Sequence, residues 1–135
     1  GIKFSVPQKG NNIVCASIWD NFPASIDIPL SGKAAELALL FIGVTNPMQS
    51  YVENARFVIK YKDGSKQTVP LVHPKNFDDW LVPALQSENE TAYFNDYNHA
   101  IVQRIHLEPK ELVKITIEAI ANEIIIGLMA VNIRK

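Results

Sequence analysis

Apolar and polar residues alternate with a period of two along several stretches of the chain, a pattern typical of β-strands that bury one face. The run 25–30 places Ile26, Ile28 and Leu30 on one face, and Pro29 indicates an edge strand or a strand end. The same alternation recurs over 101–107 and over 112–119. These runs predict strands that cover a hydrophobic core on one side only.

The clearest local prediction is a β-hairpin around Asp63-Gly64. Residues 56–62 alternate with Phe57, Ile59 and Tyr61 on the inward face, and residues 66–72 alternate in return. Asp-Gly is a favoured turn dipeptide because its residues accept the positive φ angles of tight hairpin turns. Two paired strands are therefore expected here.

Two other runs are apolar on both faces. Residues 124–133 predict a central strand buried from both sides, and Gly127 within it indicates a bulge or a close backbone approach. Residues 34–44 are good helix formers by composition, but they lie between two strand-like runs and end before Asn46-Pro47. We interpret residues 34–44 as a buried strand.

The region 73–98 has no periodicity and is rich in Asn, Asp, Pro, Tyr and Trp. A connection of this length in a compact domain is usually functional or contains a short helix. Elsewhere the pattern gives eight or nine short strands and no long amphipathic helix. We therefore predict an all-β fold, a β-sandwich of the jelly-roll type, formed by residues 1–135 as a single domain.

Composition agrees with this fold and excludes some functions. The chain has 135 residues with 47% hydrophobic residues, and Ile and Val together number 27 against 10 Leu. This β-branched excess favours strands. The net charge is −1, whereas a nucleic-acid binder or a polybasic membrane-surface module would carry a basic excess. We expect neither nucleic acid nor a membrane as a partner.

The single cysteine and the first residue add two expectations. Cys15 excludes an intrachain disulfide and a Cys-x-x-Cys zinc site, and its apolar neighbours predict a buried, inert thiol. The sequence begins at Gly1 rather than Met. We expect a module excised from a larger protein.

Catalytic and metal-binding patterns are weak. No spacing among the candidate carboxylates singles out an acid and a nucleophile for glycoside hydrolysis, and Asp78-Asp79 are expected to be solvated turn residues. The candidate carboxylates are Asp20, Asp78, Asp79, Glu88, Glu90 and Asp96. The histidines, His73, His99 and His106, lack metal-ligand spacing. We expect His106 to be exposed and His99 to form a hydrogen bond in a loop, and we predict no catalytic residue.

Four segments combine aromatic rings with acids and amides, namely 18–23, 45–50, 76–80 and 93–99. Sugars present C–H faces that stack on aromatic rings and hydroxyls that pair with Asp, Asn and Gln. The candidate ligand-binding residues are Trp19, Asp20, Asn21, Asn46, Gln49, Trp80, Tyr97 and His99. The alternative is that the two Trp side chains close the ends of the sandwich while Asn and Asp form turns.

An ordered set of motifs along most of the chain resembles a galactose-binding-like β-sandwich module. Its parts are Trp19-Asp20-Asn21-Phe22-Pro23, Ile28-Pro29-Leu30-Ser31-Gly32, Thr45-Asn46-Pro47-Met48-Gln49, Tyr61-Lys62-Asp63-Gly64-Ser65, Val69-Pro70-Leu71, Asp79-Trp80 and the closing run 121–131. Such modules are accessory domains of large secreted bacterial glycosidase-like proteins. Some hold a structural calcium, but no ligand set for it can be matched in this sequence, so we expect no cofactor.

The resemblance implies a non-catalytic module that binds carbohydrate or packs on the catalytic domain of its parent protein. It also implies a periplasmic or extracellular location through that parent. Two alternatives stay open at this point. The chain could be a purely structural domain that packs on the parent's catalytic domain, or a small glycosidase-like enzyme.

Overall fold

A computed structural model describes residues 2–5, 10, 12–19, 21–45, 49–84, 88–121 and 124–135. These residues form nine strands and no helix. The strands are β1 (Val14–Ala16), β2 (Ser25–Pro29), β3 (Glu36–Thr45), β4 (Glu53–Tyr61), β5 (Lys66–Val72), β6 (Glu90–Tyr93), β7 (His99–His106), β8 (Leu112–Ala119) and β9 (Ile124–Arg134). In the described part of the chain, no helix is long and apolar enough to cross a membrane.

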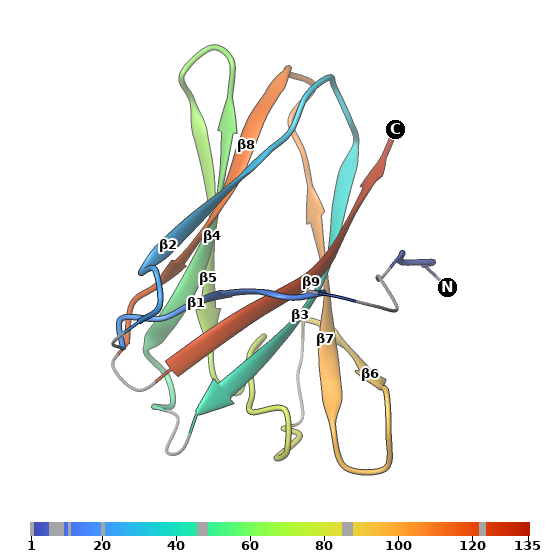
Figure 1. The fold of residues 1–135 in the computed structure, drawn as a ribbon. Coiled ribbons are helices and arrows are strands. Elements are labelled where there is room, and N and C mark those ends of the chain that lie inside the picture. Colours follow the sequence, from blue (N-terminus) through green and yellow to red (C-terminus); the bar gives the residue numbers. More distant parts are fainter. Residues whose placement is uncertain are drawn as a thin grey trace.

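The strands form two antiparallel sheets that face each other (Figure 1). One sheet has the order β1-β9-β3-β7-β6, and the other has the order β2-β8-β4-β5. The predicted all-β fold with two packed sheets is therefore confirmed. The strand over 34–44 is also confirmed, as β3, which lies between β9 and β7 and is buried along most of its length.

The core lies between the sheets and consists of the faces that the alternation predicts. Phe57, Ile59 and Tyr61 of β4 are buried, and so are Ile115 and Ile117 of β8. Aromatic rings continue this core toward one end of the sandwich. The ring of Phe41 in β3 packs edge-on against Phe57 with centroids 5.0 Å apart, and it stacks on Phe77 at 6.2 Å.

The β4–β5 hairpin is confirmed, with Gly64 at a φ of 90°. Gly127 is a site of close approach, because a Cβ there would lie 2.5 Å from Cδ1 of Ile13. The β-bulge in β9 falls near Met129 instead, where the register against β3 shifts between Leu40 and Phe41. The expectation of a fully buried Cys15 is wrong: the thiol is half-buried, although this burial still raises its pKa.

The region 73–98 contains no helix among its described residues, so the alternative of a short hidden helix is wrong there. The segment instead makes bridges and turns over 73–82 and then forms the edge strand β6. Backbone N–H groups of the turns are paired with side chains, as in the bond from Val72 N to Asn76 Oδ1 at 2.8 Å. Such pairing lets an irregular segment remain ordered without a helix.

Candidate functional site

Five connections meet at one end of the sandwich, drawn at the bottom of Figure 1, which we call the loop end. They are the connections β1–β2, β3–β4, β5–β6, β6–β7 and β8–β9. Antiparallel pairing brings alternate connections to the same end of a sheet, and the long β5–β6 connection also begins at this end, where β5 finishes. The described residues of the four segments in which the sequence combines aromatic and polar residues lie at this end.

A buried hydrogen-bonded pair of side chains lies under the β6–β7 side of the loop end. Nε2 of His99 lies 2.7 Å from Oδ1 of Asp78, and both side chains are fully buried. The second carboxylate oxygen accepts a hydrogen bond from the backbone N–H of Ala84 at 2.9 Å. Because a carboxylate only accepts, the Nε2–H of His99 donates to it. Nδ1 of His99 has no hydrogen-bond partner among the described residues.

Backbone contacts fix this pair between β3 and β7. Trp80 N donates to Gly43 O at 2.8 Å, and His99 N donates to Trp80 O at 3.0 Å. Gly43 is required at this position, since a Cβ there would lie 2.5 Å from the backbone oxygen of Asp78. The segment carrying Asp78 and Trp80 thus lies directly on the sheet.

Aromatic side chains lie beside this buried pair and reach the surface. The rings of Tyr93 and His99 lie 5.7 Å apart, and those of Trp80 and Phe94 lie 6.3 Å apart. Tyr93 is 62% exposed, whereas Trp80 is half-buried. We call Trp80, Tyr93, Phe94 and Tyr97 the aromatic group. The ring of Tyr93 packs on that of His99, and Tyr93, Phe94 and Tyr97 are exposed to solvent.

The tip of the β6–β7 connection is held by its own hydrogen bonds. Oδ1 of Asn95 accepts bonds from the backbone N–H groups of Tyr97 and Asn98, each at 2.8 Å. Nδ2 of Asn95 donates to Oδ1 of Asn98 at 2.8 Å. Tyr97 is 78% exposed at this fixed tip, next to the exposed Asp96. The tip therefore presents a ring and a carboxylate on an ordered backbone.

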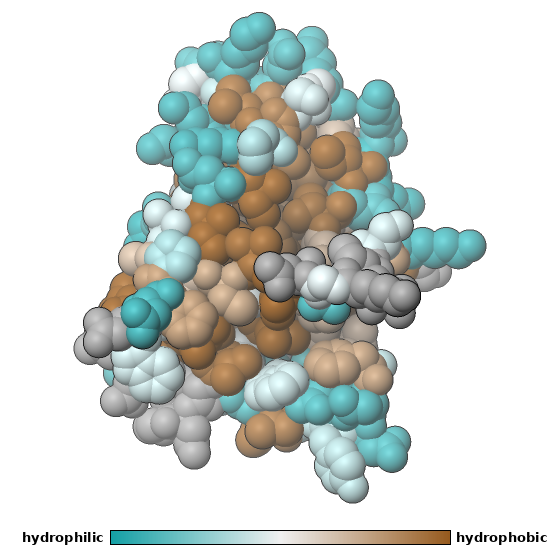
Figure 2. Space-filling model, viewed as in Figure 1, coloured by the Kyte–Doolittle hydropathy of each residue, from teal (hydrophilic) through white to brown (hydrophobic). Residues whose placement is uncertain are grey.

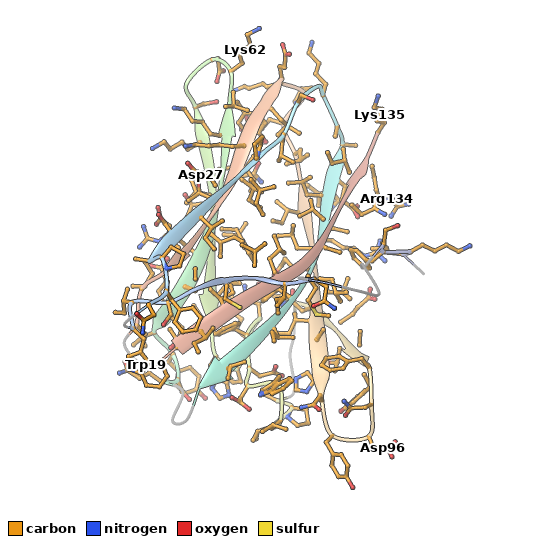
Figure 3. All side chains as sticks on the ribbon, in the orientation of Figure 1. Trp19, Asp27, Lys62, Asp96, Arg134 and Lys135 are labelled. Atoms are coloured by element: carbon orange, nitrogen blue, oxygen red, sulfur yellow. The ribbon has the colours of Figure 1, made fainter. Side chains whose placement is uncertain are left out.

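Trp19 lies on the other side of the loop end. Figure 3 shows Trp19 and Asp96 at opposite sides, from the β1–β2 and β6–β7 connections respectively. Trp19 is 53% exposed, and its backbone N–H is held by Oγ of Ser17 at 3.1 Å. Asn21, with a φ of 71°, is exposed beside it. The structure thus places the described candidate residues at one end but does not bring Trp19 against the aromatic group.

The other candidate residues have different environments. Gln49 is exposed, and its backbone oxygen accepts a hydrogen bond from Nδ2 of the buried Asn54 at 2.9 Å. His99 is buried, so it supports the surface rather than forming it. Asp20 and Asn46 lie outside the described residues.

Three aromatic residues at this end are not among the candidate residues, although the sequence analysis singled out the segment 93–99 that contains two of them. Tyr51 is 83% exposed next to the bridge between Ser50 and His73, and Tyr93 and Phe94 belong to the aromatic group. Strand alternation over 90–93 could indicate which face of the strand carries Tyr93, but a run of this length is too short to give a periodic signal.

The expectation that Asp78 and Asp79 are both solvated is wrong for Asp78, which is fully buried. Asp79 is half-buried, and its Oδ1 accepts the backbone N–H of Leu81 at 2.9 Å. His106 is exposed, as predicted. Among the described residues, no group of three or more His, Cys, Asp or Glu side chains is placed to hold a metal ion.

Comparison of the chain with protein families, with curated proteins and with solved structures finds no match.

Proposed function

We propose that the chain is a non-catalytic carbohydrate-binding module, a galactose-binding-like sandwich of the jelly-roll type that serves a glycan-degrading parent protein outside the cytoplasm. The observation that carries this proposal is the aromatic group at the loop end. Soluble domains seldom leave several aromatic rings of one connection exposed unless the rings bind something. A sugar ring is a suitable ligand, because its C–H face stacks on Tyr or Trp.

Two further features support a sugar site there. The tip is ordered by Asn95 before any ligand binds, so little conformational entropy is lost on binding. Asp96 is exposed beside Tyr97 and can accept hydrogen bonds from sugar hydroxyls. A neutral oligosaccharide also suits a chain whose net charge is −1.

Calorimetric titration with a panel of neutral oligosaccharides tests this function. We expect binding at millimolar or lower concentration, and Tyr97→Ala should weaken it by about tenfold. Trp19→Ala removes another exposed aromatic ring on the other side of the loop end and is the matched control. If no oligosaccharide binds at millimolar concentration, the proposal is wrong. Equal losses in the two variants would instead place the site across the whole loop end.

A second candidate function is packing against a neighbouring polypeptide. The observation in its favour is a contiguous apolar area between β2 and β9, visible as the brown band in Figure 2. Half-buried Ile26 and Ile28 of β2, Leu30 just after β2 and Val131 of β9 pack against the core along this side. The area is separate from the aromatic group, so both functions can coexist.

A further inference from the structure

Among the described residues, the upper half of β9 has a partner strand on one side only. β3 pairs with β9 from Ile124 to Arg134, whereas β1 pairs with Ile126–Leu128 alone. Residues 129–134 therefore form an open edge, seen in Figure 1 where β9 extends past β1 toward the C-terminus. We call residues 129–134 the open edge. At about 3.3 Å per residue, it spans roughly 20 Å.

The hydrogen-bonding groups of the open edge can be assigned. Arg134 O accepts a bond from Ala35 N, so the backbone groups of Arg134 point toward β3. In an antiparallel strand these groups alternate in direction from residue to residue. The N–H and C=O groups of Val131 and Ile133 therefore point away from β3, to the open side. They are available to a further strand.

The other sheet edges carry features that oppose strand addition, and the open edge lacks them. β2 and β5 contain Pro29 and Pro70, respectively, and β1 and β6 are short. Proline, shortness and edge charges are the usual means by which proteins prevent edge-to-edge pairing. Residues 129–133 contain neither proline nor a charged residue. An edge left in this state suits strand addition.

The space beside the open edge is apolar. Ile133 is 41% exposed although its register partner Leu37 is fully buried, because no described strand covers this side of it. The half-buried Val131 faces the same inter-sheet space, which β2 borders on the other sheet. A strand added here would bury alternate apolar side chains against these residues.

Positive charge lies at the end of the open edge. An open pocket of about 390 Å³ is lined there by apolar residues together with Lys33, His106 and Lys135. Arg134 is paired with Glu36 at 3.5 Å. Lys33 and Lys135 form no ion pair with any described residue. This end is complementary to an acidic segment.

We propose that the open edge docks an extended polypeptide segment of a partner protein, which adds antiparallel to β9, inserts alternate apolar side chains between β2 and β9, and places acidic residues against Lys33 and Lys135. Antiparallel addition matches both existing neighbours of β9 and brings the amino end of the segment to these lysines. The inference rests on the second candidate function and does not depend on sugar binding.

A synthetic peptide tests the proposal, with aspartates at its amino end followed by valine and threonine in alternation. We expect saturable binding by fluorescence anisotropy. We also expect slower hydrogen exchange at the amides of Val131 and Ile133. Reversing the charge pattern, with lysines in place of the aspartates, should weaken binding about tenfold or more.

Val131→Pro and Val131→Thr form the matched pair of variants. Proline removes the N–H that faces the open side and is tolerated in an edge strand, whereas threonine keeps both the N–H and the β-branch. Val131→Pro should weaken peptide binding about tenfold or more, while Val131→Thr should not. Circular dichroism of both variants verifies folding. If Val131→Pro is unfolded, N-methylation of the peptide backbone at alternate positions provides the same comparison on the wild-type chain.

Three results would overturn the proposal. They are absence of binding at millimolar peptide, equal binding to both Val131 variants, and dimerisation of the chain through the open edge in sedimentation experiments, since a second copy would then be the occupant. Oligosaccharide titration of Val131→Pro separates the two functions. If Val131→Pro loses peptide binding but keeps sugar binding, the substitution affects only the docking site at the open edge.

Discussion

Nε2 of His99 and Oδ1 of Asp78 lie 2.7 Å apart in the interior, joining the start of β7 to the irregular segment that follows β5. The two residues are far apart in sequence, and neither side chain has access to water. This contact ties the segment that carries Trp80 to the five-stranded sheet. The surface of the aromatic group therefore depends on a pair that no ligand can reach.

Replacing Asp78 should destabilise the fold markedly. Asp78→Ala leaves Nε2–H of His99 and the N–H of Ala84 without their partner, and buried groups left in this way cost about 2–4 kcal/mol. Urea unfolding measures the loss. Asp96→Ala, at an exposed position, is the control and should change the free energy of unfolding by less than about 0.5 kcal/mol. Equal effects would contradict the structural role of Asp78.

Two glycine substitutions should differ in their effects. A Cβ at Gly43 meets the backbone oxygen of Asp78 at 2.5 Å, whereas a Cβ at Gly127 meets the flexible end of Ile13. We expect Gly43→Ala to destabilise by about 2–3 kcal/mol and Gly127→Ala by less, because a side chain can move where a backbone cannot. Thermal unfolding of the two variants gives the order, and the reverse order would contradict the described packing.

Asn54 should stabilise the β3–β4 connection. Its Nδ2 donates to Gln49 O at 2.9 Å and to Val52 O at 3.2 Å, and the residue is buried. Asn54→Ala removes both bonds and should cost about 1–3 kcal/mol in urea unfolding. Asn95→Ala also removes bonds that order a connection, but at an exposed tip, and should cost less. If Asn54→Ala leaves the free energy of unfolding unchanged, other contacts hold the β3–β4 connection.

The carboxyl group of Asp63, in the β4–β5 turn, should titrate at an unusually low pH. Hydrogen bonds from Ser65 and Lys110 lower the pKa of Asp63 to about 2, from an ordinary value of 3.8. Because the folded pKa is the lower one, its stabilising contribution is fully present above about pH 4 and is lost as the pH falls toward 2. Ser65→Ala should raise the pKa of Asp63 in an NMR titration, whereas Ser31→Ala should leave it unchanged.

Local alternation along the chain determined much of the fold. Buried strand faces, such as the one formed by Phe57, Ile59 and Tyr61, follow from a period of two, because the hydrophobic effect favours burial of the apolar side chains on one face of a sheet. The β4–β5 hairpin follows from Asp63-Gly64, since turn geometry is set by the residues of the turn itself. Even the ambiguous run 34–44 could be assigned from its flanking segments, as β3 shows.

Long-range placement was decided only by the tertiary structure. Nothing within a few residues of Asp78 indicates that it meets His99, so a solvated turn residue was the natural expectation. In the same way, alternation identifies Trp19 and Tyr97 as aromatic residues near strand ends but not as occupants of opposite sides of the loop end. The open edge of β9 likewise depends on where β1 stops pairing. Sequence periodicity reports which face of a strand avoids water, whereas contacts between distant segments depend on how the strands are ordered in the sheets, and that order is a property of the whole packed chain.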